Sequence, residues 1–300
     1  MISLRRPVGD ATPKRSERMA GDMNDVPFGV PRLDAIVGGG APPGTVVLLA
    51  GEAGAGAREF LYTSAAMNAL ARSDADLFDL HYGDLDAEAS VPPEVHYLSF
   101  TADRDHISRE MSYVMDDEIV DAATPAIDFV DLSPEYFQLS PIPRDWYVGE
   151  ATSLQDLGQR RHRDDVLDAL GDYLSEHAEG NLVCIDSISD LVGAMSDEMA
   201  WTDIAMVMKG LAKAAHEWGG LILLLVNVDT LEPTELGHLM DAAGGTLQFE
   251  WESGGSKRSR TMVVRAFRGV LSRLEAENIV RFETEIHEGG LDVSDVRKIR

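Results

Sequence analysis

Short apolar runs alternate with segments of helical spacing along most of the chain. The runs predict buried strands at residues 45–50, 95–100, 127–132, 181–186 and 221–226. Between the runs, apolar side chains at helical spacing predict helices at residues 58–70, 105–115, 164–177 and 202–218. Strands and helices in this order call for a mainly parallel central sheet with helices on both faces. The pattern therefore predicts an α/β fold.

The last part of the chain breaks this alternation. Residues 246–252 and 261–267 predict a closing pair of strands around a polar turn, and the final segment predicts a further strand and a basic tail. We therefore expect a C-terminal antiparallel extension of the sheet. Residues 74–93 and 133–147 are rich in Asp, Gly, Pro or irregularly spaced aromatic residues and predict surface loops.

The chain predicts a short leader followed by one domain. Residues 1–25 hold few large apolar side chains and show no period, so we expect a disordered leader. The alternative is a basic arm for an acidic partner, formed by Arg5, Arg6, Lys14, Arg15 and Arg18. Residues 26–300 are expected to form a single domain, because a hydrophobic fraction of 44% supplies a sizeable core.

A glycine-rich segment follows the first predicted strand and precedes the first long predicted helix. This order is that of a P-loop, in which backbone N–H groups and the start of the helix cradle phosphates. A tight turn is the alternative for the glycines alone. The predicted site for ATP or ADP is Gly51, Glu52, Ala53, Gly54, Ala55, Gly56, Ala57, Arg58 and Glu59.

The side chains that give a P-loop its chemistry are replaced. The loop usually carries Lys, which reaches the terminal phosphates, and then Ser or Thr, whose hydroxyl binds Mg²⁺. Ala57 and Arg58 occupy these two positions. Because the missing groups stabilise the charge of the transferring phosphoryl group, we expect no rapid hydrolysis by the usual route.

The flanks of the loop resemble the RecA superfamily, and specifically its KaiC-like branch. The resemblance rests on residues 27–34, Pro-Phe-Gly-Val-Pro-Arg-Leu-Asp, and on residues 38–44, Gly-Gly-Gly-Ala-Pro-Pro-Gly. It implies a RecA-like P-loop core over roughly residues 27–269. It also implies assembly of such cores side by side, either with copies of this chain or with an intact ATPase paralogue.

Asp186 ends an apolar strand and resembles the Walker B carboxylate, which helps to hold Mg²⁺ opposite the P-loop. The following Ser187 and Asp190 also resemble the family pattern. Asp186 is therefore the predicted catalytic and Mg²⁺-binding residue. The alternative is a cap for the next helix.

A catalytic glutamate is missing from the position that the resemblance implies. In similar enzymes it lies just beyond the second strand, where this chain has Thr101 and Ala102. Asp103 is the nearest carboxylate and the second catalytic candidate, with helix capping as the alternative.

Residues 265–269 resemble the segment with which KaiC-like subunits reach a nucleotide on their neighbour. Arg268 and Gly269 match that segment, whereas Ala266 replaces a Lys. Surface ion pairing is the alternative for Arg265 and Arg268.

The net charge of the chain restricts the kinds of partner that it is expected to bind. With 26 Lys and Arg against 52 Asp and Glu, the formal net charge is −26, which opposes binding to nucleic acid. Such acidity suggests a halophilic protein, whose self-repulsion concentrated salt would screen. We predict loss of secondary structure on dialysis into low salt, measured by circular dichroism. Full stability there would instead favour an ordinary acidic protein with a charged partner.

Cysteine usage and hydropathy exclude other classes. Cys184 is the single cysteine, so the chain builds neither an internal disulfide nor a thiolate-rich zinc site. There is no apolar run long enough for a membrane helix and no signal-peptide pattern. We expect a cytoplasmic protein with a buried, inert thiol.

The preferred functional hypothesis is a catalytically impaired RecA/KaiC-like protein that acts as a regulatory or assembly subunit. Such a protein would either still bind nucleotide or have lost the ability to bind it. One alternative is an atypical Mg²⁺-dependent ATPase that uses Arg58 and Asp186. A second alternative, a DNA-repair accessory protein, follows from the wider superfamily, and the net charge argues against it.

Overall fold

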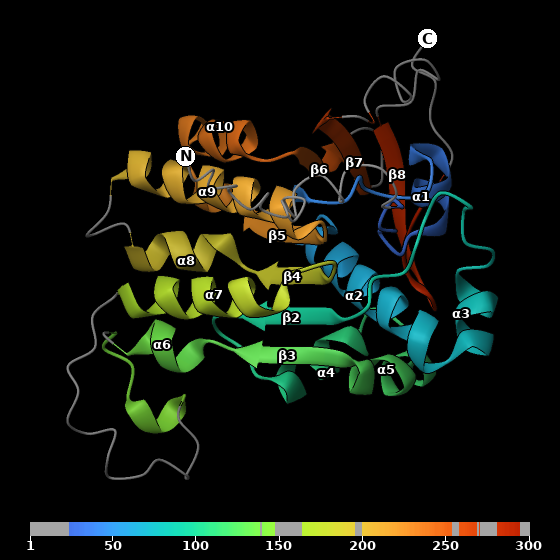
Figure 1. Ribbon diagram of the computed structural model, residues 1–300, viewed down its shortest axis with the longest axis horizontal. Coiled ribbons are helices and arrows are strands. Elements are labelled where there is room, and N and C mark those ends of the chain that lie inside the picture. Colours follow the sequence, from blue (N-terminus) through green and yellow to red (C-terminus); the bar gives the residue numbers. More distant parts are fainter. Residues whose placement is uncertain are drawn as a thin grey trace, which may run out of the picture.

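The computed structural model describes residues 24–138, 140–147, 164–195, 200–253, 258–268, 270 and 281–294. Within these residues the chain forms a central sheet with a layer of helices on each face (Figure 1). The predicted leader lies outside the described residues except for Asn24 and Asp25, and Asp25 forms a bridge with Ala89.

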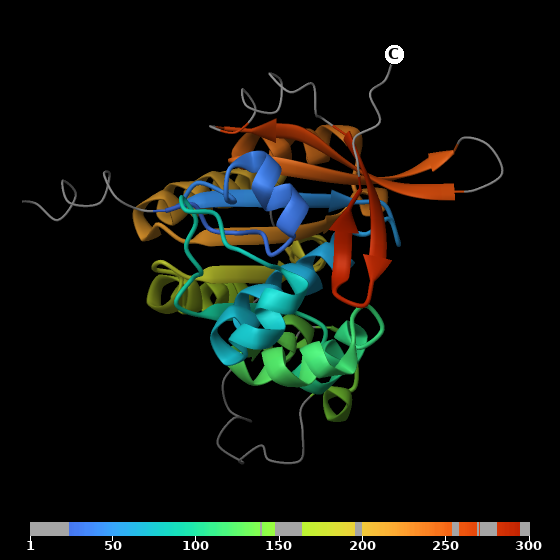
Figure 2. The same cartoon turned by 90° about the vertical axis from the view of Figure 1, so that its right-hand side faces the viewer.

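The described residues form one sheet of nine strands in the order β3-β2-β4-β5-β1-β6-β7-β8-β9. The strands are β1 (Thr45–Gly51), β2 (Val95–Ser99), β3 (Ile127–Asp131), β4 (Leu182–Asp186), β5 (Leu221–Asn227), β6 (Gly245–Ser253), β7 (Arg258–Phe267), β8 (Arg281–His287) and β9 (Gly290–Val293). Neighbours from β3 to β6 are parallel, and those from β6 to β9 are antiparallel (Figure 2). The predicted fold class, a parallel core with a C-terminal antiparallel extension, is confirmed.

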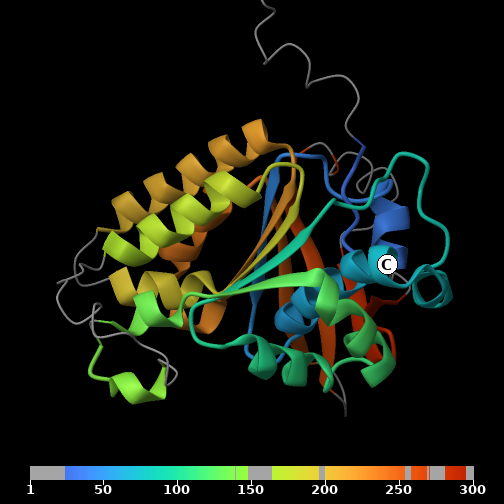
Figure 3. The same ribbon diagram turned by 60° about the horizontal axis from the view of Figure 1, so that its bottom comes forward.

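Alternate side chains of the buried strands feed two hydrophobic cores. In β1, Val47 and Leu49 face one core, whereas Val46, Leu48 and Ala50 face the other. The first core packs against α1 (Pro31–Val37), α2 (Ala57–Ser73), α3 (Ala75–His81), α4 (Arg104–Met111) and α5 (Asp117–Ala123). The second packs against α6 (Ser133–Phe137), α7 (Asp164–His177), α8 (Ile188–Met195), α9 (Trp201–Trp218) and α10 (Pro233–Ala242) (Figure 3).

Two of the predicted loops contain helices, so those predictions are wrong in part. In the first, α3 begins because the side chain of Asp74 accepts a hydrogen bond from the amide of Leu77 at 3.0 Å, and the helix buries Leu77 and Phe78. In the second, α6 has a proline in its first turn, a position that needs no amide donor.

The segment before β1 is ordered around Asp34, a buried residue of α1. Its carboxylate accepts hydrogen bonds from the amides of Phe28, Gly29 and Val30 at 2.8–3.2 Å and from the hydroxyl of Tyr82 at 3.1 Å. Burial raises the pKa of Asp34 to about 8, although these four donors oppose the rise. The segment is thereby fixed against the first core.

Two smaller expectations concern burial and membranes. Cys184 is fully buried in β4, as expected, and burial raises the pKa of its thiol. In the part of the chain that the structure describes, the helices are too short or too polar to span a bilayer.

Candidate functional site

The glycine-rich loop joins β1 to α2 as the sequence predicts. Gly54 and Gly56 have φ of 71° and 117°, and α2 begins at Ala57 directly after Gly56. A helix start leaves its first N–H groups without intrahelical acceptors, and they attract anions. The strand, loop and helix of a P-loop are therefore present.

Arg58 and Asp186 form an ion pair at the centre of the site. The guanidinium Nη2 of Arg58 donates to Oδ1 of Asp186 at 3.0 Å, and the side chains are 51% and 8% exposed. The hydroxyl of Tyr97, on the neighbouring strand β2, donates to the other oxygen, Oδ2, at 2.9 Å. Both carboxylate oxygens of Asp186 are thus engaged by side chains of the protein.

The protonation equilibria follow from this burial. Burial raises the pKa of the Asp186 carboxyl, while the charge of Arg58 and the hydrogen bond from Tyr97 oppose the rise. For Arg58, burial is the largest influence and lowers the pKa, but Asp186 together with Tyr62, Tyr97 and Asp190 raises it by more, so the pKa is raised on balance. Burial and then the charge of Asp186 raise the pKa of Tyr97. Arg58 and Tyr97 therefore keep their protons and donate hydrogen bonds to Asp186.

These groups do not fit a Mg²⁺ ion. Mg²⁺ requires oxygen ligands in near-octahedral geometry. Each oxygen of Asp186 already accepts a hydrogen bond, and the P-loop position that should supply a hydroxyl instead supplies the positive charge of Arg58, which would repel the cation. Among the described residues, no cluster of three or more His, Cys, Asp or Glu is arranged to hold a metal ion.

The β6–β7 hairpin closes over the outer side of the loop. Trp251 donates from its amide to Glu52 Oε2 and from its ring Nε1 to the Ala53 carbonyl, both at 3.1 Å. Arg260, its cross-strand neighbour, lies over the Trp251 ring and donates to the Gly54 carbonyl at 3.0 Å. These contacts hold the loop against the hairpin.

A second clamp comes from the segment after β5. Asp229 accepts a hydrogen bond from the amide of Ala53 at 3.0 Å. Asn227, at the end of β5, accepts from the Asp229 amide at 3.0 Å and holds that turn in place. The loop is thus bound from both neighbouring strands of β1.

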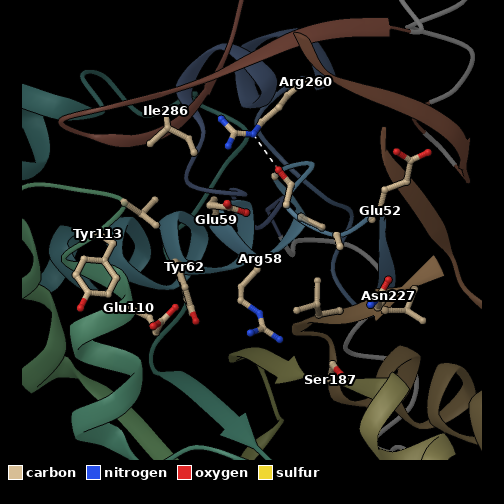
Figure 4. A pocket seen from close by; sticks show the side chains of 18 residues that line it. Glu52, Arg58, Glu59, Tyr62, Glu110, Tyr113, Ser187, Asn227, Arg260 and Ile286 are labelled. Carbon is tan, nitrogen blue, oxygen red and sulfur yellow. Dashed lines mark hydrogen bonds between the residues drawn. The ribbon is translucent and has the colours of Figure 1, made fainter. Parts of the chain in front are cut away.

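A cavity of about 530 Å³ opens beside the loop, within the range of small-molecule sites. The loop, Arg58 and Arg260 line one end of it, and Tyr62, Glu110 and Tyr113 line the other (Figure 4). The cavity therefore combines two arginines and backbone N–H groups with two tyrosine rings and three carboxylates, those of Glu52, Glu59 and Glu110.

Asp103 caps a helix, which is the alternative to a catalytic role that the sequence left open. Its side chain accepts a hydrogen bond from the His106 amide at 2.9 Å and caps α4. It is not among the residues that line the cavity, and the amides of Thr101 and Ala102 donate to Ser99 Oγ. The structure thus brings Asp186 to the loop but does not bring Asp103 there.

Arg265 forms surface contacts with Gln248 at 2.6 Å and Glu250 at 3.3 Å, as in the ion-pairing alternative. Gly269 lies outside the described residues.

Sequence reasoning missed several residues of the site. Most of them belong to elements that are far from the loop along the chain, and their position in the site depends on the fold. Asn227 could have been identified from the sequence, because it stands at the end of an apolar strand and such strand ends meet at one edge of a parallel sheet. The missed residues are Tyr62, Tyr97, Glu110, Tyr113, Asn227, Asp229, Trp251 and Arg260.

Comparisons with known proteins bear on the family and the fold. A family model described as an AAA domain matches residues 12–228. A KaiC-like protein from Pyrococcus horikoshii has a similar structure, with a TM-score of 0.57 and 18% identity over 91% of this chain and 100% of that one. The flagellar accessory protein FlaH from Methanocaldococcus jannaschii is also similar, with a TM-score of 0.52 and 15% identity over 88% and 96% of the two chains. No curated protein matches by sequence.

Proposed function

The chain belongs to the AAA-domain family and has the RecA-superfamily core of the KaiC-like branch, and from this premise we propose that it is a regulatory or assembly subunit with impaired ATP hydrolysis. The Arg58–Asp186 ion pair carries the proposal. It stands where working members of P-loop families bring a hydroxyl, a carboxylate and Mg²⁺ together.

Three groups that support hydrolysis are replaced. Ala57 has no ammonium for the terminal phosphates, Arg58 has no hydroxyl, and Thr101 and Ala102 stand in the stretch where a glutamate would polarise water. Removing one group that stabilises transition-state charge typically costs about 10²–10³ in kcat. Arg58 is a poor copy of the lysine, because it lies one residue later and its guanidinium is bound to Asp186.

Retention of nucleotide is supported by the shape and chemistry of the cavity. Its loop end offers N–H groups and two arginines, as polyphosphate requires. Its other end offers the carboxylate of Glu110 and the exposed ring of Tyr113, which suit the amino group and the face of a nucleobase. ATP or ADP is therefore the proposed ligand.

A role through association is part of the proposal. The similar FlaH protein is described as an accessory protein, and RecA-like cores assemble side by side. The proposed partner is a second copy or an intact ATPase paralogue, whereas the net charge of −26 opposes nucleic acid. A strictly monomeric sedimentation profile in high salt would contradict self-association.

We predict no Mg²⁺-dependent phosphate release above the buffer rate when the purified full chain is incubated with ATP in high salt. The measurement is a phosphate-release assay with Asp186→Asn as the matched control. Release that depends on Mg²⁺ and that Asp186→Asn abolishes would overturn the proposal and favour the atypical ATPase.

A further inference from the structure

We infer that the cavity beside the loop binds a nucleoside polyphosphate without a divalent cation, and that the guanidinium of Arg58 takes the charge-neutralising place of Mg²⁺. This inference rests on the proposed function and specifies the ligand form for the same site. It differs from the usual chemistry of P-loops, in which the metal accompanies the nucleotide.

The first support is the position of Arg58. It follows Ala57 at the start of α2, lines the cavity and is 51% exposed, so its head group borders both Asp186 and the space beside the loop. The hydrogen bond to Asp186 engages one of five N–H donors of a guanidinium. The planar fork suits bidentate contacts with phosphate oxygens. One side chain can therefore bridge the carboxylate and a phosphate, as a metal ion does elsewhere.

The second support is the state of Asp186. Arg58 and Tyr97 each donate to one of its two oxygens, so a metal ion would have to compete with both donors for the carboxylate. It would also lie beside the positive charge of Arg58 without a hydroxyl ligand from the loop. The positive charge that balances Asp186 is therefore supplied by a side chain of the protein, Arg58.

The third support is a second cation on the opposite side of the loop. Arg260 lines the cavity, and its Nε is held by the Gly54 carbonyl at 3.0 Å (Figure 4). Stacking on Trp251 holds its plane. Glu52 and Glu59 also line the cavity and bring negative charge near the loop, and the carboxylate of Glu52 accepts a hydrogen bond from the Trp251 amide at 3.1 Å. A polyphosphate thus meets two arginines on either side of the backbone cradle.

The test is calorimetric titration of the full chain with ATP and with ADP in high-salt buffer, once with EDTA and once with excess Mg²⁺. We expect binding in EDTA at least as tight as in Mg²⁺. Arg58→Ala should weaken binding in EDTA at least tenfold. The matched control is Arg265→Ala, which should leave the affinity unchanged. Arg265 lies on β7 and contacts Gln248 and Glu250 outside the cavity.

Asp186→Asn separates the two chemistries by the sign of its effect. If Arg58 is the counter-ion, removing the competing negative charge should tighten metal-free binding severalfold, and Asn still offers an oxygen to Tyr97. If Mg²⁺ binds at Asp186, the same change should weaken binding. Circular dichroism checks that the variant is folded, and weaker binding by the folded variant would overturn the inference.

Two further outcomes of the titration would overturn the inference, and the phosphate-release assay tests the proposed function separately. Binding seen only with Mg²⁺ would overturn the inference, while the proposal of impaired hydrolysis would still stand or fall on phosphate release. Absence of binding in both buffers would also overturn it and would leave a subunit that inherited the fold without a ligand.

Discussion

Arg58→Ala is expected to lower the free energy of unfolding by about 2–3 kcal/mol, because it leaves the carboxylate of Asp186 buried without its cation. Breaking a fully buried pair typically costs about 3–5 kcal/mol. The half exposure of Arg58 reduces this figure, since solvent already screens part of the attraction. Denaturant titration in high salt measures the change.

The control is the double variant Arg58→Ala with Asp186→Asn, in which the unpaired charge is gone. It should recover most of the lost stability. An equal loss in both variants would mean that Arg58 stabilises the fold by packing of its alkyl chain.

The pH dependence of Arg58→Ala follows from the raised pKa of Asp186. A buried carboxyl with a raised pKa binds protons more tightly in the folded state than in the unfolded state, so stability falls as the pH rises. Loss of Arg58 removes the cation that opposes this rise. The stability difference from the unaltered protein should therefore be largest at alkaline pH and shrink as the pH falls toward the ordinary range of a carboxyl.

The sequence predicted the components of the site but not their connection. Strand, glycine loop and helix are adjacent in the chain, so their local pattern was sufficient to place the P-loop. The sequence predicts Asp186 as a Mg²⁺ ligand and identifies Arg58 as a replacement within the P-loop motif, with no link between the two beyond the alternative of an atypical ATPase. Their direct pairing depends on the sheet order, which places β4 beside β5 and β5 beside β1, and on Tyr97 from β2.

The same limit applies to the fold. Long amphipathic helices and apolar strands were predictable because each carries many periodic positions. The short helix α3 was missed because Asp74 was assigned to a loop by its composition, whereas it caps a helix. The contact of Trp251 and Arg260 with the P-loop required the register of the β6–β7 hairpin, which the polar turn alone does not define.

Gly40→Ala is expected to cost about 3–5 kcal/mol, because it combines backbone strain with a collision against main-chain atoms. Gly40 has φ of 142°, a conformation that side chains with a Cβ rarely adopt. An added Cβ would overlap the carbonyl of Val26 and approach Pro27 Cα within 2.8 Å. Val26 and Ala41 exchange two hydrogen bonds of 2.8 Å beside it, so that backbone has little freedom to withdraw.

Gly83→Ala is a comparison variant that combines a positive φ with open space. Gly83 has φ of 84°, yet an added Cβ there would meet nothing within 4 Å. Its expected cost is therefore about 1–2 kcal/mol, the usual penalty of a left-handed conformation alone. Denaturant titration of both variants in high salt should separate them clearly. Similar losses would show that the segment around Val26 moves to accommodate the methyl group, and that the ordering of residues 26–44 around Asp34 is looser than its hydrogen bonds imply.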